Sequence, residues 1–461
     1  MSERYDLIVL GGGSAARAGA KKAAEDHGAK VALVESTRWG GSCPNVACKP
    51  TKAYLVAAEL LHDVNRLADV VGIDIGPARA DLLKVKARKD SLKKSPSAWV
   101  KDLNEQGFDT YEGEAELISA DTVRIFGDEQ LSGERILIAT GSRTAIPPIE
   151  GIDDIDWLDH VSALDLTELP ESLLVVGAGA VGLEFGQALA RFGSRVLIVD
   201  AGDQLSPRSD KQAADELAAA LEDEGIEVVL GSYVRQVAKH GAGIAGTIGP
   251  REGQGSREVR VAEVLLASGR APNVEALNLD RHGIERHKLG IVVDEHMRTS
   301  VEGIWAAGDV TGLAQLTPIA QYQARIAADD MFGDSAITAD YSVLPTTIFT
   351  DPEVAGVGLT EDEARNEGLD FEVVLNGPVQ RAGLLEAKHV LYKLIYERES
   401  RRVRGIHVVA RGAGDIVQGF SLAMKLGATV DDIAGMHHVY PTFGEGLKAA
   451  AEKAKPVPVK A

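Results

Sequence analysis

Two segments of the chain share one pattern that strongly restricts how it can fold. In each, an apolar run enters a glycine-rich turn, an alanine-rich stretch of helical character follows, and a second apolar run ends in an acidic residue. The first copy spans residues 6–35 and the second spans residues 173–200. A buried parallel strand that leads into a glycine turn at a helix N-terminus is typical of dinucleotide-binding folds, because free amides and the helix dipole bind a pyrophosphate there. We therefore expect an α/β protein with two such units.

The glycine turns and the acids that close each copy are the predicted nucleotide contacts. Glu35 closes the first copy and Asp200 closes the second, where a carboxylate can accept hydrogen bonds from a ribose. A single glycine turn is weak evidence, because tight turns use glycine for many reasons. Two turns, each with its acid in place, favour nucleotide binding over incidental turns. The turns read Gly11-Gly12-Gly13-Ser14-Ala15-Ala16 and Gly177-Ala178-Gly179-Ala180-Val181-Gly182.

The length of 461 residues exceeds what one hydrophobic core usually organises, so about three domains are expected. The first dinucleotide domain should consist of residues 1–149 and 270–338, and the second of residues 150–269. Residues 339–461 alternate strand-like and helical segments without a third phosphate-binding turn, which indicates an α+β domain. Two dinucleotides in one chain imply that something passes between them.

Charge and hydropathy exclude several classes of partner. The net charge of -20 repels polyanions, which argues against nucleic acid or an anionic membrane surface and leaves small molecules. No apolar run is long enough to span a bilayer, and the run Leu7 to Leu10 is too short for the core of a signal peptide. We expect a cytoplasmic protein.

The chain has two cysteines, Cys43 and Cys48, in a segment that directly follows the first copy. A reducing cytosol rarely retains a structural disulfide. A thiolate near a helix N-terminus is stabilised by the helix dipole, and a neighbouring lysine adds to the effect. Zinc is excluded because no second pair of Cys or His lies close by, and we expect no metal site. Two buried apolar cysteines are the alternative, but the dinucleotide unit upstream favours redox function.

These motifs, in this order, resemble those of the pyridine nucleotide-disulfide oxidoreductases, the family of dihydrolipoamide dehydrogenase, glutathione reductase and mercuric reductase. The resemblance spans nearly the whole chain, and it implies FAD in the first domain, NAD(P) in the second and a homodimer formed by the third. It rests on the two turns, Glu35, Gly40 to Lys52, Ala139-Thr140-Gly141, Glu184, Gly269-Arg270-Ala271-Pro272-Asn273, Ala307-Gly308-Asp309 and Phe349 to Glu353.

The resemblance also implies roles for individual residues. Cys48 would be the thiol that faces the flavin, and Cys43 the exchange thiol that meets the substrate. Lys52 and Glu184 resemble the ion pair beside the flavin N5, and Asp309 resembles the residue that holds the ribityl and phosphate portion. The other cofactor contacts implied are Gly41, Ser42, Thr140, Gly141, Gly308, Gly269 and Arg270.

One position departs from the disulfide-reducing members, which place a His before Pro-Thr and orient it with a Glu five residues later. Here Tyr440 occupies the His position, while Glu445 keeps its place. A phenol with an ordinary pKa of about 10 is a poor proton shuttle at neutral pH, whereas imidazole titrates at about 6.5. His438 is the candidate replacement, although an isolated His is more often a surface or packing residue. The segment from Tyr440 to Glu445 would complete the partner subunit's active site.

Mercuric reductases resemble the chain more closely here, because they have Tyr followed by Thr and by Glu-Gly-Leu-Lys, as at Tyr440, Thr442 and residues 445–448. Soft Hg(II) suits a thiolate pair and needs no acid catalyst for a leaving thiol. With two cysteines in the sequence, both in the segment at residues 43–48, we expect neither their C-terminal cysteine pair nor their N-terminal metal-capturing module. We expect mercuric-reductase-like reduction of a thiol-reactive acceptor, either a small molecule or a soft metal.

Three alternatives remain open: dihydrolipoamide dehydrogenase or another disulfide reductase, a quinone reductase, and a flavin-bound redox sensor with little turnover.

The sequence also indicates which nucleotide is preferred. Asp200 would accept hydrogen bonds from a 2′-hydroxyl and repel a 2′-phosphate, and residues 201–203 offer no basic clamp. We therefore expect NADH to be preferred over NADPH.

Overall fold

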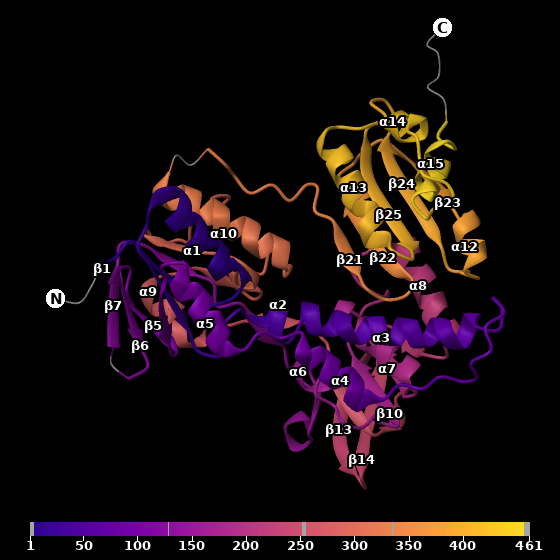
Figure 1. Cartoon of the computed structure of the whole chain (residues 1–461), viewed down its shortest axis with the longest axis horizontal. Helices are drawn as coiled ribbons and strands as arrows, with labels where there is room; N and C mark the ends of the chain where they lie inside the picture. Colours follow the sequence, from indigo (N-terminus) through magenta and orange to yellow (C-terminus); the bar gives the residue numbers. More distant parts are fainter. Residues whose placement is uncertain (1–3, 128, 251–254, 334–335, 456–461) are drawn as a thin grey trace. The chain divides into compact units, whose positions relative to one another are not determined.

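The computed structural model describes residues 4–127, 129–250, 255–333 and 336–455. Its elements, drawn in Figure 1, group into two compact units. Unit 1 consists of Met1–Thr51, Ala87–Ala145 and Gly269–Asp340, and unit 2 of Lys52–Lys86, Ile146–Ser268 and Tyr341–Ala461. Within the described residues, no helix is both long enough and apolar enough to cross a bilayer.

Unit 1 is built around a five-stranded parallel sheet. Successive side chains of a strand point to opposite faces, so β2 sends Leu7 and Val9 into one apolar cluster and Ile8 and Leu10 into another. Burial on both faces explains why these strands read as continuous apolar runs. The strand order is β20 (Ile304–Ala306), β8 (Ile136–Ile138), β2 (Leu7–Leu10), β3 (Val31–Glu35) and β4 (Asp109–Glu112).

Different layers cover the two faces of this sheet. Helices α1 (Ser14–His27) and α10 (Thr317–Phe332) pack on the face that carries Leu7 and Val9. The other face packs against a second sheet, so unit 1 has a helix–sheet–sheet arrangement. The order of this second sheet is β1 (Arg4–Tyr5), β7 (Glu129–Gly133), β6 (Thr122–Ile125) and β5 (Ala115–Ser119).

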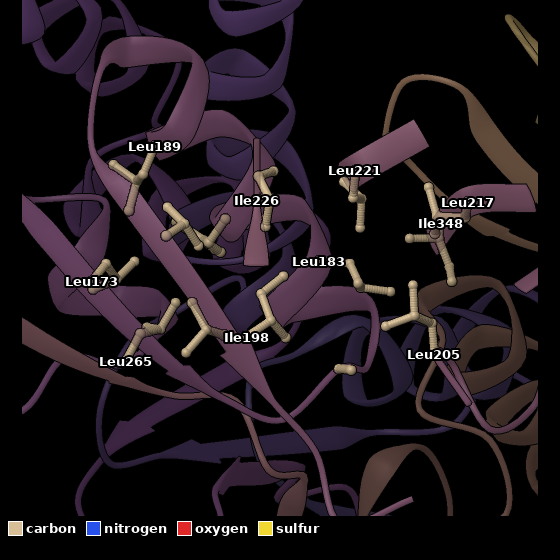
Figure 2. Packing of buried hydrophobic residues seen from close by; sticks show 14 of the residues in the cluster. Leu173, Leu183, Leu189, Ile198, Leu205, Leu217, Leu221, Ile226, Leu265 and Ile348 are labelled. Atoms are coloured by element: carbon tan, nitrogen blue, oxygen red, sulfur yellow. The ribbon is translucent and has the colours of Figure 1, made fainter. Parts of the chain in front are cut away.

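Unit 2 repeats this plan with a four-stranded parallel sheet. Leu173 and Val175 of β10 face helices α7 (Ala180–Phe192) and α8 (Lys211–Asp223), in the cluster that Figure 2 shows in part. Leu174 of the same strand faces an antiparallel sheet instead. The parallel order is β12 (Glu227–Val229), β11 (Arg195–Val199), β10 (Ser172–Val176) and β16 (Glu263–Leu266), and the antiparallel order is β13 (Ser232–His240), β14 (Gly243–Pro250) and β15 (Arg257–Val261).

The C-terminal part of unit 2 is a five-stranded antiparallel sheet. Its strands run β21 (Thr346–Ile348), β22 (Glu353–Gly358), β25 (Val403–Ala410), β24 (Leu391–Glu397) and β23 (Phe371–Asn376). Helices α13 (Ala413–Lys425), α14 (Val430–Gly435) and α15 (Glu445–Ala451) cover one face. On the other face Val354 and Val409 join Leu217 of α8 in one cluster. The predicted α/β fold with two parallel-sheet units and an α+β C-terminal part is confirmed.

The remaining elements range in length from two residues in β18 to 20 residues in α3. They are α2 (Ser42–Asn45), α3 (Cys48–Leu67), α4 (Leu82–Ser91), α5 (Pro96–Glu105), α6 (His160–Ala163), α9 (Leu279–His282), α11 (Glu361–Asn366), α12 (Gln380–Leu384), the 3-10 helices η1 (Ile152–Asp154), η2 (Glu275–Leu277) and η3 (Asp309–Thr311), and the strand pairs β9 (Ser142–Thr144) with β17 (Arg270–Pro272) and β18 (Arg286–His287) with β19 (Gly290–Ile291).

A buried ion cluster ties the start of α8 to the C-terminal sheet. Nζ of Lys393 donates to both carboxylate oxygens of Asp210, at 2.9 and 2.8 Å, and to Oε2 of Glu361 at 2.7 Å. Asp210 also caps α8 by accepting from the amide of Gln212. Burial works against ionisation of Asp210, but the charges of His407 and Lys393 and the hydrogen bonds from Lys393 hold the pKa of its carboxyl below the ordinary value.

We expect Asp210→Asn to destabilise the protein at pH 7 by about 3 kcal/mol, because Lys393 stays buried and loses one of its carboxylates. The folded-state pKa of Asp210 lies below the unfolded value of about 3.9, so the pair stabilises above that pH and is lost as the pH falls. Thermal unfolding followed by circular dichroism from pH 8 to pH 3 should show wild type and variant converging in acid.

The matched control is Asp215→Asn on the same helix, where the carboxylate pairs with Lys211 on the surface. Exposed pairs contribute little, so this variant should unfold close to wild type at every pH. An equal loss in both variants, or a gap that does not change with pH, would contradict the assignment.

Candidate active site

The first glycine turn joins β2 to α1, and backbone contacts fix it. The amide of Gly11 donates to the carbonyl of Val34 at 2.7 Å. Gly11 has a φ of +118°, and a Cβ there would lie 2.3 Å from the carbonyl oxygen of Ala139, so only glycine fits. Helix α1 starts after Gly13 without a side-chain cap, which leaves its N-terminal amides suited to a pyrophosphate.

The second turn has the same geometry between β10 and α7. The amide of Gly177 donates to the carbonyl of Val199 at 2.8 Å, and a Cβ on Gly177 would lie 2.5 Å from the carbonyl oxygen of Ala267. Helix α7 starts after Gly179, again without a side-chain cap. At Gly182 a Cβ would lie 2.0 Å from the carbonyl oxygen of Gly177, so this helix crosses its turn too closely for a larger residue.

The two closing acids each bind back to their own turn. Oε2 of Glu35 accepts from the amide of Gly12 at 2.6 Å, and Oδ2 of Asp200 accepts from the amide of Ala178 at 2.6 Å. The second oxygen of Asp200 accepts from the amide of Gly202 at 2.7 Å. These bonds were not foreseen from the sequence, and they hold each carboxylate at the mouth of its turn, where a ribose would lie.

A third group of predicted cofactor residues meets in unit 1 at the ends of β8 and β20. Oγ of Ser142 donates to Oδ2 of Asp309 at 2.7 Å and accepts from Nε of Arg270 at 2.7 Å. Oγ1 of Thr140 donates to the carbonyl of Asn273 at 2.6 Å. Sequence reasoning missed Ser142, although it directly follows the motif Ala139-Thr140-Gly141. The predicted residues Gly141, Gly269 and Gly308 border the same contacts, since they adjoin Ser142, Arg270 and Asp309.

The two thiols lie side by side in unit 1. Cys43 is half-buried in α2, Cys48 is exposed at the start of α3, and the two are in hydrogen-bond contact without a disulfide. The contact with Cys48 and burial raise the pKa of the Cys43 thiol. Sγ of Cys48 also lies 3.6 Å from Oγ1 of Thr317, the first residue of α10, which sequence reasoning missed.

Residues 40–48, which we call the cysteine loop, lie directly against the first glycine turn. The amide of Gly40 donates to the carbonyl of Gly12 at 3.1 Å, and a Cβ on Gly41 would lie 2.5 Å from the Cα of Gly13. Nδ2 of Asn45 closes the loop by donating to the carbonyl of Gly41 at 2.7 Å. The predicted residue Ser42 opens α2 at this place. The cysteine loop is therefore in direct backbone contact with the predicted pyrophosphate site.

Lys52 and Glu184 form an ion pair in unit 2. Lys52 lies one turn after Cys48 on α3, and its Nζ donates to both carboxylate oxygens of Glu184, at 2.9 and 2.7 Å. The amide of Phe349 donates to the same carboxylate at 3.0 Å, and the Phe349 ring centroid lies 4.1 Å from Nζ of Lys52. Glu184 is buried, so its charge is balanced within this group.

The C-terminal site residues lie on a segment next to α15. Tyr440 is 72% exposed, and Glu445 is the first residue of α15. The ring of His438 stacks on Phe420 with centroids 6.5 Å apart, and burial and the charge of Lys448 lower its pKa. His438 therefore packs against Phe420, and its lowered pKa disfavours the protonated ring. In the part of the chain that the structure describes, no cluster of three or more potential metal ligands is present.

Comparison with known proteins identifies the family. Residues 5–324 match the model of the pyridine nucleotide-disulphide oxidoreductases, and residues 344–451 match the model of their dimerisation domain. The chain belongs to this family. The predictions of family, of enzyme class and of a redox flavoprotein are confirmed, and the dimerisation domain supports a homodimer.

Relatives from several lineages cover almost the whole chain. It is 35% identical to the mercuric reductase of Lysinibacillus sphaericus over 97% of this chain and 82% of that protein. It is 31% identical to the mitochondrial dihydrolipoyl dehydrogenase of Pisum sativum over 98% and 91%. A Cu(II) complex of the HOCl-induced flavoprotein disulfide reductase RclA from Escherichia coli matches with 28% identity and a TM-score of 0.85 over 98% of this chain and 100% of that one.

The family uses FAD and a pyridine nucleotide, and the residues of both glycine turns suit these groups. In unit 1 the N-terminus of α1 has no side-chain cap, and Gly13 and Gly41 allow the cysteine loop to lie directly against the turn. Glu35 supplies a carboxylate from the end of β3, and Asp309 supplies one shortly after the end of β20. In unit 2 the uncapped start of α7 and Asp200 form the equivalent set.

We expect Gly41→Ala to weaken FAD binding, because the added methyl would push the cysteine loop away from Gly13. Overpacking of this kind costs about 1–3 kcal/mol, or about a ten- to hundred-fold higher Kd if it acts on binding. Flavin fluorescence during titration of the apoprotein gives the Kd. Gly28→Ala is the matched control, since Gly28 also has a positive φ but nothing lies within 4 Å of its Cβ position. Equal losses in both variants would show backbone strain alone.

Proposed function

We propose that the protein uses NADH to reduce a thiol-reactive acceptor at Cys43 and Cys48, with a soft metal ion such as Hg(II) as the first candidate. The observation that carries this proposal is the pair of sulfurs in mutual contact on a partly exposed loop. Adjacent thiolates are the ligands that soft metals prefer. Mercuric reductases among the relatives, and the Cu(II) complex of RclA, support a thiophilic metal.

The roles of the residues follow the family resemblance. When bound, FAD would supply two-electron transfer between the nicotinamide and the site of Cys43 and Cys48. Cys48 starts a helix of 20 residues, so the helix dipole favours its thiolate, and Cys43 exchanges with the acceptor. Lys52 and Glu184 hold a balanced ion pair one turn further along α3. Overall, NADH loses a hydride, Hg(II) gains two electrons to become Hg(0), and one proton is released.

The C-terminal segment favours a metal over a disulfide. Reduction of a disulfide needs a proton for the departing thiol, and a phenol such as Tyr440 supplies it poorly at neutral pH. His438 is turned onto Phe420 and has a lowered pKa, so it is poorly placed to take over. A metal ion bound by two thiolates has no such leaving group.

We propose a homodimer in which Tyr440 and Glu445 reach the partner subunit's active site. The C-terminal domain exposes apolar side chains on and after α13 and beside Tyr440, namely Leu422 at 62%, Leu426 at 79% and Val439 at 76%. Such residues are typical of a surface that a second subunit covers. We also propose that the chain divides into three domains at residues 149, 269 and 338. A cytoplasmic location is part of the same proposal, because the reducing cytosol would keep the two thiols reduced.

Reduction of a small disulfide is the second candidate. Relatives named dihydrolipoyl dehydrogenase are 31% to 35% identical to the chain, and Glu445 is retained beside Tyr440. This candidate differs from the first in its need for a proton donor, and the difference can be measured.

The test is NADH oxidation by the FAD-loaded protein with thiol-complexed Hg(II) and, in parallel, with lipoamide. We expect mercury-dependent turnover, and a loss of about a hundred-fold or more in Cys48→Ala, because a reacting thiol acts as part of one unit. A dye that takes electrons directly from flavin serves as the control for intact FAD and NADH sites. Turnover that survives both Cys43→Ser and Cys48→Ala would indicate a quinone-type acceptor instead.

Tyr440→His supplies the missing imidazole and separates the two candidates further. We expect it to raise lipoamide turnover relative to Hg(II) turnover, whereas Tyr440→Phe should lower neither, because the phenol takes no part in metal reduction. If wild type already reduces lipoamide faster than Hg(II), the disulfide candidate replaces the metal.

The preference for NADH can be tested separately. Asp200 should repel the 2′-phosphate of NADPH. A repulsion of about 1.4 kcal/mol between these two charges corresponds to a ten-fold lower kcat/KM. We expect kcat/KM for NADH to exceed that for NADPH by at least about ten-fold, and Asp200→Ser to narrow the gap. Asp203→Ser, an exposed acid three residues later, is the control and should leave the ratio unchanged. A clear advantage for NADPH in wild type would overturn the preference.

A further inference from the structure

Two cations without an acidic partner lie near the redox thiols in unit 1: Arg17 interacts electrostatically with Cys43, and Lys49 directly follows Cys48 in the sequence. Arg17 lies in the first turn of α1, its guanidinium carbon is 4.7 Å from the centroid of the Trp99 ring, and its Nε is buried without a hydrogen-bond partner. Lys49 follows Cys48 on α3, and its Nζ donates to the carbonyl of Leu92 at 2.6 Å. In the stretches that the structure describes, neither cation forms an ion pair with a carboxylate.

Trp99 holds Arg17 next to the cysteine loop. This ring lies on α5, and a Cβ on Gly40 would be 2.5 Å from one of its atoms. Nζ of Lys94 lies 4.6 Å from the same ring centroid, but its charge is balanced by Asp102. A cation over an indole face is held electrostatically, so the Arg17 guanidinium has a fixed place beside the loop.

The contacts that these two side chains make with Trp99 and with the carbonyl of Leu92 do not neutralise their charges. The protein carries a net charge of -20, and acidic residues are abundant elsewhere on it. Lys93, on the same segment, does pair with Asp90 at 2.9 Å. Arg17 lowers the pKa of Cys43, but contact with Cys48 and burial raise it more. A guanidinium with a free donor is suited to a carboxylate or another oxyanion.

We propose that Arg17 and Lys49 select an anionic acceptor, so that the compound that reaches Cys43 and Cys48 carries a carboxylate or a comparable oxyanion. This inference rests on the proposed function and names its substrate class. The anion could belong to the thiol that complexes a soft metal or to a carboxylated disulfide. Both sources share the chemistry that the two cations recognise.

The first experiment needs no turnover. The reduced holoenzyme is alkylated with iodoacetate, which is anionic, and with iodoacetamide, which is neutral and nearly the same size. A change in thiol pKa alters both rates equally, so their ratio reports the local charge alone. We expect Arg17→Gln to lower the iodoacetate-to-iodoacetamide ratio about ten-fold, Lys49→Gln to lower it less, and rising ionic strength to reduce it in wild type. Lys101→Gln on α5 is the control, because Lys101 is exposed and lies near Glu105 at 3.7 Å.

The second experiment distinguishes the two sources of the anion. The kcat/KM is compared for Hg(II) complexed by mercaptoacetate or by mercaptoethanol, and for 5,5′-dithiobis(2-nitrobenzoate) or neutral 4,4′-dithiodipyridine. We expect the anionic member of the physiological pair to be preferred in wild type and the preference to fall about ten-fold in Arg17→Gln.

An alkylation ratio that Arg17→Gln leaves unchanged would overturn the inference, and so would equal losses for the anionic and neutral acceptors. Absence of turnover with all four acceptors, together with a ratio that does respond to Arg17→Gln, would overturn the proposed function and leave the anion selection standing.

Discussion

The close approach of two backbones at each glycine turn is the constraint on which the rest of the structure depends. Gly11 and Gly177 pass so near the carbonyls of Ala139 and Ala267 that no side chain fits. The turn amides that follow are held by Glu35 and Asp200 from the next strand. This fixes the direction in which each helix leaves its turn. In unit 1 it also fixes the cysteine loop, because Gly41 rests on Gly13.

The sequence pattern predicted these two strand–turn–helix units because the residues that form each unit lie close together in the sequence. Strand, turn, helix and closing acid follow one another within 30 residues in each copy. The side chains of β2 and of β10 alternate between two buried clusters, so each strand must be a continuous apolar run. The contacts of Ser142 with Asp309 and of Cys48 with Thr317 could not be predicted, because they join residues 167 and 269 positions apart. No periodicity encodes such a distance.

The buried ion cluster around Lys393 and the segment around Tyr440 also make contacts that the sequence pattern does not predict. Lys393 inside an apolar strand is a visible anomaly in the sequence, but its partner Asp210 lies 183 residues earlier. Tyr440 was recognised as a departure because a motif surrounds it. The fate of His438 was not predictable, since its stacking on Phe420 depends on how α13 covers the sheet. Sequence shows which residue is unusual, and packing decides what it contacts.

The surroundings of the two thiols explain why we propose a metal rather than a disulfide as the first candidate acceptor. Contact with Cys48 and burial raise the pKa of the Cys43 thiol, which disfavours its thiolate. Thiol–disulfide exchange requires the thiolate to form first, and the family's imidazole is replaced by Tyr440. A soft metal ion displaces the proton as it binds, because metal ligation and deprotonation of a thiol are one coupled step. Under the proposed function, the raised pKa of Cys43 and the absence of an imidazole at position 440 would therefore impair reaction with a disulfide more than binding of a soft metal.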